Sequence, residues 1–220
     1  MPCVPNGGRR MLIKKENLPL VLAELKKLYP KVIIPLKHEN AWQLLMAVIL
    51  SAQCTDERVN QITPHLFAKY PTAQALAQAE IKEVEKIIHS AGFYHSKALS
   101  LIESSKRICQ VYGGEVPQSM AELLTLRGVA RKTANVLLGD YFNKPEGIVV
   151  DTHVKRLSFR LGFTRQTDPV KIEQDLMKRI PKDKWQWIGI ALILHGRSVC
   201  PARKPLCEKC TLQKFCEKNI

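Results

Sequence analysis

Four cysteines near the end of the sequence constrain the local fold more than any other feature. They fall within 17 residues, at Cys200, Cys207, Cys210 and Cys216, in the pattern Cys-x6-Cys-x2-Cys-x5-Cys. Four thiolates on short loops can converge on one iron–sulfur cube. Zinc held by four cysteines usually takes two Cys-x2-Cys pairs, and only Cys207 and Cys210 form such a pair here. The spacing therefore predicts a single 4Fe–4S cluster.

The composition indicates an anionic partner. The chain has 34 basic and 20 acidic residues, a net charge of +14. A polyanion such as nucleic acid is the leading candidate, although ribosomal and membrane-surface proteins share this charge. The longest apolar run, 44–50, is too short to cross a bilayer, and no secretory signal is evident. We therefore expect no membrane partner and a cytoplasmic, nucleoid-associated location.

The other cysteines are scattered at Cys3, Cys54 and Cys109, and we expect them to be small buried residues. The loop after Cys200 carries two adjacent cations, Arg203 and Lys204, between two prolines. Beside a cluster in a basic protein, such a pair is suited to contact a nucleic-acid phosphate.

Helix start signals recur along almost the whole chain. Residues that can cap a helix precede apolar periodic stretches at Asn17, Asn40, Thr55, Thr72, Glu80, Ser96, Ser119, Asp151 and Asp168. The last helix is expected from about Asp183 to His195, with Gly196 closing it. Two strand-like runs, 32–34 and 148–150, are too short to build a sheet. The pattern predicts an all-α protein of about ten helices.

The segment 126–133 reads as a helix end, a tight turn and a new helix start. Its turn contains Arg127, Gly128, Ala130 and Arg131. Such a turn directs backbone N–H groups outward, which suits a phosphate oxygen and requires no base contact. Any helical hairpin shares this pattern, so it is weak evidence alone.

Lys132 lies in the first turn of the new helix, where the helix dipole disfavours a cation. Asp151 follows 19 residues later, after an apolar run, in a position to cap the next helix. An amine near a positive dipole and a carboxylate is a recognisable arrangement for an activated nucleophile. A solvated surface lysine and a capping aspartate are the structural alternatives.

Several motifs together identify a family by resemblance. They are 51–56 (SAQCTD), 92–98 (GFYHSKA), 131–135 (RKTAN), 150–153 (VDTH), 194–197 (LHGR) and the cysteine spacing. In these motifs the chain resembles the endonuclease III family, bifunctional DNA glycosylases of the helix-hairpin-helix superfamily. The resemblance covers nearly everything from about residue 18 to the end.

The resemblance implies two helical lobes with a DNA cleft between them. A six-helix, barrel-like lobe would span 34–145, with the helix-hairpin-helix at about 115–142. Residues 18–33 plus 146–220 would form the 4Fe–4S cluster lobe, and 1–17 a flexible tail. The partner would be double-stranded DNA with a damaged base or an abasic site, bound by a monomer.

The family also implies roles for single residues. Lys132 would be the nucleophile that forms a Schiff base, with Asp151 assisting it. Gln53 matches a glutamine that fills the gap left by the extruded base, Phe93 stands at an apolar wedge, and Lys204 matches a basic DNA contact. The reaction would be removal of an oxidised pyrimidine followed by β-elimination at the abasic site.

Three positions depart from the family pattern. The family hairpin usually reads Leu-Pro-Gly-Val-Gly, whereas this chain has Arg127 for the proline and Ala130 for the second glycine. Alanine would be strained if that position needs a positive φ, and Arg127 could compensate with a direct salt link. His95 replaces a common asparagine beside the wedge and could alter the opposite-strand preference. Neutral drift explains all three equally well.

Two other classes of function stay open. Monofunctional relatives, such as adenine or mismatch-type glycosylases, usually lack the hairpin lysine. A catalytically silent DNA-binding or redox protein would keep the basic surface and the cysteines but lose the reactive pair. Because Lys132 and Asp151 are both present, we expect a bifunctional DNA glycosylase and lyase.

Overall fold

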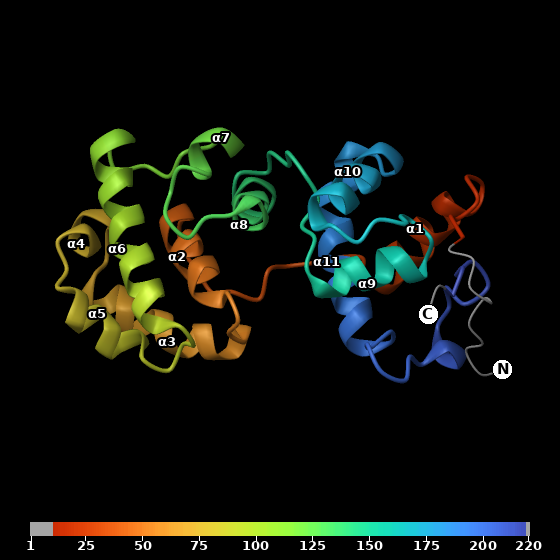
Figure 1. Cartoon of the computed structure of the whole chain (residues 1–220), viewed down its shortest axis with the longest axis horizontal. Helices are drawn as coiled ribbons and strands as arrows, with labels where there is room; N and C mark the ends of the chain where they lie inside the picture. Colours follow the sequence, from red (N-terminus) through yellow and green to blue (C-terminus); the bar gives the residue numbers. More distant parts are fainter. Residues whose placement is uncertain (1–10, 219–220) are drawn as a thin grey trace. The chain divides into compact units, whose positions relative to one another are not determined.

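Every regular element in the described part of the chain is helical. The computed structural model describes residues 11–218, and these form eleven α-helices, one π-helical turn and two 3-10 helices (Figure 1). Neither 32–34 nor 148–150 forms a strand. The all-α prediction is confirmed. None of the helices in residues 11–218 combines the length and apolarity of a membrane span.

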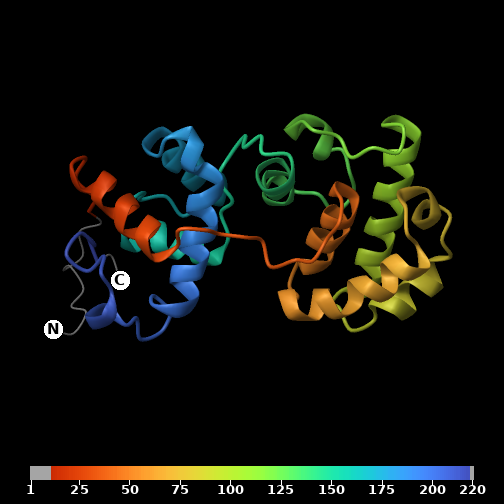
Figure 2. The same ribbon diagram turned by 180° about the vertical axis from the view of Figure 1, so that it is seen from behind.

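The contacts divide the chain into two units. Unit 2 is Ile34–Glu146 and contains α2–α8, whereas unit 1 combines Met1–Ile33 with Gly147–Ile220 and contains α1 and α9–α11. Figure 2 shows the red helix α1 beside blue helices from the C-terminal part of the chain. Unit 1 is therefore built from two segments that are distant in sequence.

Unit 2 is arranged around one almost fully buried helix. In α2 (Ala41–Ser51), every residue from Trp42 to Leu50 is buried, and the Asn40 side chain accepts a hydrogen bond from the Gln43 backbone N–H. Helix α2 contacts α3, α6, α8 and the π-helical turn η1. The other elements are α3 (Asp56–Lys69), α4 (Ala73–Ala77), α5 (Ile81–Ile88), α6 (Tyr94–Val111), α7 (Met120–Leu123), α8 (Arg131–Val136) and η1 (Leu137–Tyr141).

The predicted helix caps explain most of these boundaries. Thr55, Thr72 and Ser119 each accept a hydrogen bond from the backbone N–H three residues later. The resemblance implied six helices in this region, and the described unit has seven α-helices, of which α4 and α7 are short. The start predicted at Ser96 is wrong. Helix α6 begins at Tyr94, because Phe93 turns the chain through the left-handed region.

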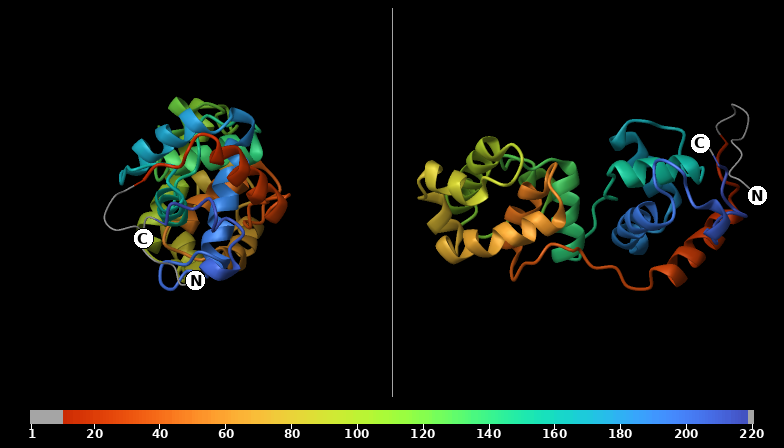
Figure 3. Two further views of the ribbon diagram at one scale, coloured as in Figure 1. Left: turned by 90° about the vertical axis from the view of Figure 1, so that its right-hand side faces the viewer. Right: turned by 90° about the horizontal axis from the view of Figure 1, so that it is seen from below.

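Unit 1 packs α9 (Thr152–Arg160) and α1 (Asn17–Leu28) against α11 (Trp185–Ser198), as Figure 3 shows. Helix α10 (Pro169–Arg179) contacts α9, and two 3-10 helices, η2 (Lys182–Lys184) and η3 (Cys207–Lys209), lie in the connections. The fully buried side chains Leu25, Phe163 and Ile188 share one core.

Gly196 does not close the last helix, contrary to the sequence prediction, because α11 continues to Ser198. A Cβ at Gly196 would lie 3.0 Å from His153 Nδ1 and 3.1 Å from Arg156 Nη2. This glycine therefore allows α9 to approach α11 closely.

The tail predicted over 1–17 lies partly outside the described residues, which begin at residue 11. In the described part, Ile13 is only 3% exposed, and its N–H donates a 2.9 Å hydrogen bond to the Gly162 carbonyl. This part of the predicted tail packs on unit 1. The prediction was wrong here because one apolar side chain and one backbone hydrogen bond leave no periodic signal.

Gly162 gives a stability prediction. It has φ +78°, and an added Cβ would lie 2.7 Å from the backbone nitrogen of Ile13. Gly113 has a similar φ of +63° with no atom within 4 Å of an added Cβ. Gly113→Ala should lower the free energy of unfolding by about 1–2 kcal/mol, because alanine disfavours the left-handed conformation. Gly162→Ala should lower it clearly more, because its Cβ would also collide with the backbone of Ile13. Chemical denaturation measures both, and equal losses would contradict the close packing of Ile13.

Candidate nucleic-acid interface and catalytic residues

The turn before α8 is fixed against α6 by a glycine and a serine. Gly128 has φ +78°, and a Cβ there would lie 2.9 Å from Ser100 Cβ. The Ser104 hydroxyl donates a 2.6 Å hydrogen bond to the Arg127 carbonyl. Ser100 and Ser104 both belong to α6, so this one helix fixes the position of the turn.

Ala130 takes an extended conformation, with φ −97° and ψ 171°. The strain that positive φ would have imposed on this alanine does not arise, because Gly128 is the left-handed residue of the turn. The methyl side chain of Ala130 cannot cap α8, so the first backbone N–H groups of that helix are left for water or an anion. Arg127 and Ala130 are exposed, and Arg131 is half-buried.

Lys132 is the second residue of α8 and is exposed. Within residues 11–218 it makes no hydrogen bond or ion pair, and the first turn of α8 holds no acidic residue. The side chain therefore has no structural partner among the described residues.

Two loops of unit 2 present Gln53 and Phe93 side by side. Both residues are exposed and left-handed, with φ +53° and +59°. A Cβ added to Gly92 would lie 3.7 Å from the Gln53 carbonyl oxygen, so the two loops are in contact. Left-handed non-glycine residues cost free energy and occur preferentially at functional sites.

His95 is anchored to the preceding helix. Its Nδ1 lies 2.7 Å from Oε1 of the buried Glu85 on α5. The hydrogen bond with His95 is the main cause that holds the pKa of Glu85 below its usual range. The imidazole also stacks on Tyr94, with ring centroids 4.0 Å apart. The ring orientation beside Phe93 is therefore constrained from two sides.

In unit 1, Asp151 caps α9 as predicted. Its Oδ1 accepts a 2.8 Å hydrogen bond from the Val154 N–H, and the side chain is half-buried. In the same helix, Arg156 donates to the carbonyls of Gly196 and Cys200 at 2.9 and 3.0 Å. Arg156 thus ties the first turns of α9 to the start of the cysteine region.

The four predicted ligands line one cavity of unit 1, together with Arg160 and His195. Arg160 is buried and donates to Cys200 Sγ at 3.2 Å and to the Pro201 carbonyl at 2.8 Å. His195 Nε2 lies 3.4 Å from Cys210 Sγ. Burial lowers the pKa of His195 to about 4, so its imidazole is neutral at pH 7.

The four cysteines of this cavity differ in how well they suit a single metal ion and an iron–sulfur cluster. Burial raises the pKa of Cys210 and raises that of Cys216 to about 11, so these thiols ionise only beside a positive centre. No three His, Cys, Asp or Glu residues in the described chain are grouped closely enough for a metal ion. A cube distributes its ligands over four irons, so sulfurs spread around one cavity suit a cluster. Cys207 is disulfide-bonded, and cluster assembly requires its reduction.

Arg203 and Lys204 are both exposed on the loop between Cys200 and Cys207. Lys204 has φ +52°, a left-handed conformation that turns the chain between its two prolines. The loop is held at its base by Arg160, whose Nη2 donates a 2.9 Å hydrogen bond to the Ala202 carbonyl.

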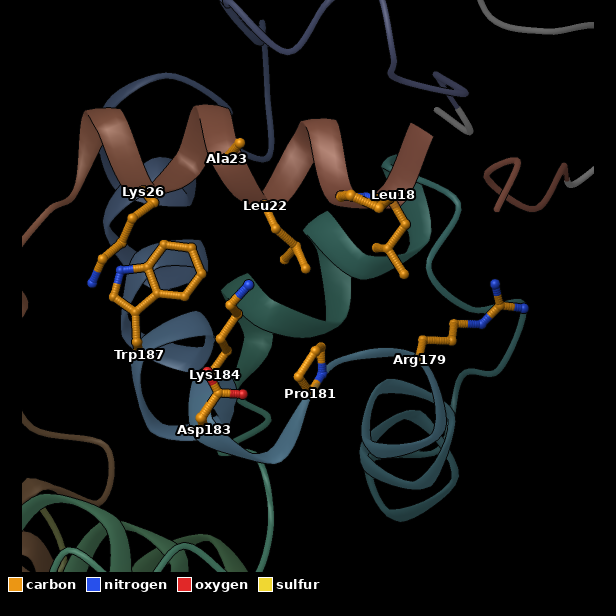
Figure 4. A pocket seen from close by; sticks show the side chains of 10 residues that line it. Leu18, Leu22, Ala23, Lys26, Arg179, Pro181, Asp183, Lys184 and Trp187 are labelled. Carbon is orange, nitrogen blue, oxygen red and sulfur yellow. The ribbon is translucent and has the colours of Figure 1, made fainter. Parts of the chain in front are cut away.

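A separate hollow of about 450 Å³ lies between α1 and the segment that joins α10 to α11 (Figure 4). Leu18, Leu22 and Trp187 line it, with Lys26 5.1 Å from the centre of the Trp187 ring. None of the predicted DNA-binding, catalytic or metal residues lines this hollow. It is a feature of unit 1 distinct from those residues.

No sequence motif marks most of the residues that support these sites. Ser104 and Arg160 act through contacts made across long sequence separations, and no motif marked them. Lys97 lies in the motif 92–98 and shares a helix face with the buried residues Leu101, Ser104 and Ile108. A lysine among the apolar positions of an amphipathic helix indicates a buried charge, and this feature is visible in the sequence.

Comparisons with known proteins agree with each other. Residues 46–182 match the family described as HhH-GPD superfamily base excision DNA repair protein. Endonuclease III of Synechocystis sp. is 54% identical over 94% of this chain and 95% of its own length. A solved non-covalent endonuclease III–DNA complex has a TM-score of 0.89 at 41% identity, covering 94% of this chain and 97% of that one. A trapped covalent endonuclease III–DNA intermediate has the same TM-score and identity, covering 94% and 98%.

Proposed function

The chain belongs to the HhH-GPD superfamily of base excision DNA repair proteins, and on that premise we propose that it is a bifunctional DNA glycosylase and lyase. Its substrate is double-stranded DNA that carries an oxidised pyrimidine or an abasic site. The observation that carries this proposal is Lys132, an exposed lysine at the start of α8 that has no structural partner in residues 11–218.

The hairpin supplies sequence-independent DNA binding. Its uncapped α8 N–H groups can donate to phosphate oxygens, and Arg127 and Arg131 add positive charge beside them. On the cysteine loop, Arg203 and Lys204 are further phosphate contacts. Contacts of this kind position an enzyme on DNA without selecting a base.

The wedge residues supply base extrusion. A base must leave the stack before its glycosidic bond can be attacked, and the vacated space must be filled. Phe93 is 68% exposed and apolar, which suits insertion between base pairs. Gln53 is beside it and can hydrogen-bond to an unpaired base, and the anchored His95 ring extends the same surface.

Lys132 supplies the covalent chemistry. Its unprotonated amine attacks the sugar C1′, and the damaged base leaves with the electrons of the glycosidic bond and takes up a proton. Opening of the sugar ring gives an iminium between Lys132 Nζ and C1′. Loss of a C2′ proton then expels the 3′ phosphate, and water releases the nicked product. Asp151 stabilises the cationic sugar and accepts protons.

The cysteine region has a structural role in this proposal. We infer that Cys200, Cys207, Cys210 and Cys216 hold a 4Fe–4S cluster, which keeps the loop of Arg203 and Lys204 folded. This inference is supported by the shared cavity and by the raised pKa of Cys216, whose thiolate a positive centre would stabilise. The cluster takes no part in the covalent steps above.

A trapping experiment tests the central proposal. Borohydride should reduce the iminium and leave a stable covalent complex with DNA that contains dihydrouracil or an abasic site. Lys132→Ala should give no such complex, because no other nucleophile is expected to replace the amine. Lys155→Ala, an exposed lysine on α9, is the control. A trapped complex with Lys132→Ala equal to that of the wild type would contradict the proposal.

Asp151 and Asp168 form a matched pair for a second test. Both cap a helix through the side chain, and asparagine caps equally well. Asp151→Asn should keep the folding stability and abasic-DNA affinity but lower the base-excision rate about 100-fold or more. Asp168→Asn should change neither rate nor stability. Equal excision rates for the two variants would show that Asp151 is only a cap.

Iron analysis tests the cluster. Wild-type protein prepared without oxygen should contain about four iron and four sulfide per chain. Cys216→Ser should lose most of this iron and unfold at a lower temperature. Cys109→Ser should retain it, because Cys109 lies on α6 in the other unit. Iron-free wild type, or equal iron in the two variants, would refute the four-cysteine site.

A further inference from the structure

Lys97 is a buried cation without a hydrogen-bond partner among residues 11–218. It lies in the first turn of α6, and the residue is 6% exposed. Its ammonium nitrogen is fully buried and makes no hydrogen bond within the described part of the chain. Burial lowers the pKa of Lys97, and the nearby Cys54 thiol opposes this shift. An unpaired buried ammonium group is costly, so it is rare in folded proteins.

The surroundings of Lys97 are the two loops that carry the wedge residues. Cys54 directly follows Gln53, and the Lys97 N–H donates a 3.1 Å backbone hydrogen bond to the Phe93 carbonyl. The Gln53 carbonyl lies against Gly92, and both Gln53 and Phe93 are left-handed. Lys97 is therefore close to the junction at which the loops meet.

The proposed function requires these loops to act together. Gln53 and Phe93 must enter the duplex as the base leaves it, and the left-handed backbone at each carries strain in the free protein. Reorientation of the 51–54 segment would bring backbone carbonyls toward a group that can donate three hydrogen bonds. The buried ammonium of Lys97 is such a group.

We propose that Lys97 is a positioning residue for base extrusion. Its unpaired ammonium receives the carbonyls of the Gln53 loop when DNA is bound, which locks Gln53 and Phe93 in the inserted position. The cost of the unpaired ammonium in the free protein is offset in the complex. Lys97 contacts neither the sugar nor the base, and this role rests on the glycosylase function proposed above.

Lys97→Met separates this role from a structural one. Methionine fills a similar volume and removes the unpaired charge, so the unfolding temperature should stay the same or rise. The single-turnover rate of dihydrouracil excision from duplex DNA should fall about tenfold or more, because the wedge is misplaced. Strand cleavage at a preformed abasic site should stay close to that of the wild type, because no base has to be extruded.

The matched control is Lys106→Met, on the same helix, where the lysine side chain is 44% exposed and pairs with Glu103 at 3.0 Å. Its two rates should match those of the wild type. Equal losses of excision and cleavage in Lys97→Met, no loss of either, or a variant that is less stable or unfolded would each overturn the proposal. Wild-type protein that neither excises nor cleaves would instead overturn the function on which it rests.

Discussion

The packing of Gly128 against α6 is the contact on which the proposed DNA-binding surface of unit 2 depends. It brings the hairpin onto the face of α6 that carries Ser100 and Ser104, and the Ser104 hydroxyl holds the Arg127 carbonyl. The same helix begins after Phe93 and carries His95 and Lys97. One helix therefore contacts the turn before α8, begins next to Phe93 and supports the hairpin that leads to Lys132.

In unit 1, side-chain hydrogen bonds to the backbone hold the C-terminal region against α9. The C-terminal region contains little regular structure after α11, and two arginines of α9, one half-buried and one buried, hold it through hydrogen bonds to its backbone. Arg156 and Arg160 extend from α9 to the backbone carbonyls of Gly196, Cys200 and Pro201. Arginine suits this task because its planar group donates several hydrogen bonds in fixed directions. The exposed cations of the cysteine loop are thereby joined to the helix that Asp151 caps.

Most helix starts could be predicted from the sequence, because helix caps depend on residues close together in the chain. Capping residues such as Asn40, Thr55 and Asp151 act within three residues of themselves, and the structure confirms these caps. The prediction that Gly196 ends the last helix is wrong because Gly196 lies within α11, where it allows close contact with α9, about 40 residues away in sequence. The packing of Ile13 left no local signal for the same reason, because its hydrogen-bond partner Gly162 is distant in sequence. Lys97, in contrast, stands out in the sequence as a lysine within the apolar period of α6.

We expect the reactive nitrogen to lie on the hairpin that Gly128 holds against α6. Proteolysis and mass spectrometry of the borohydride-trapped wild-type complex identify the residue that carries the sugar remnant. We expect a single modified site, Lys132. A remnant on another lysine, or on several lysines in similar amounts, would place the reactive nitrogen elsewhere and refute this mechanism.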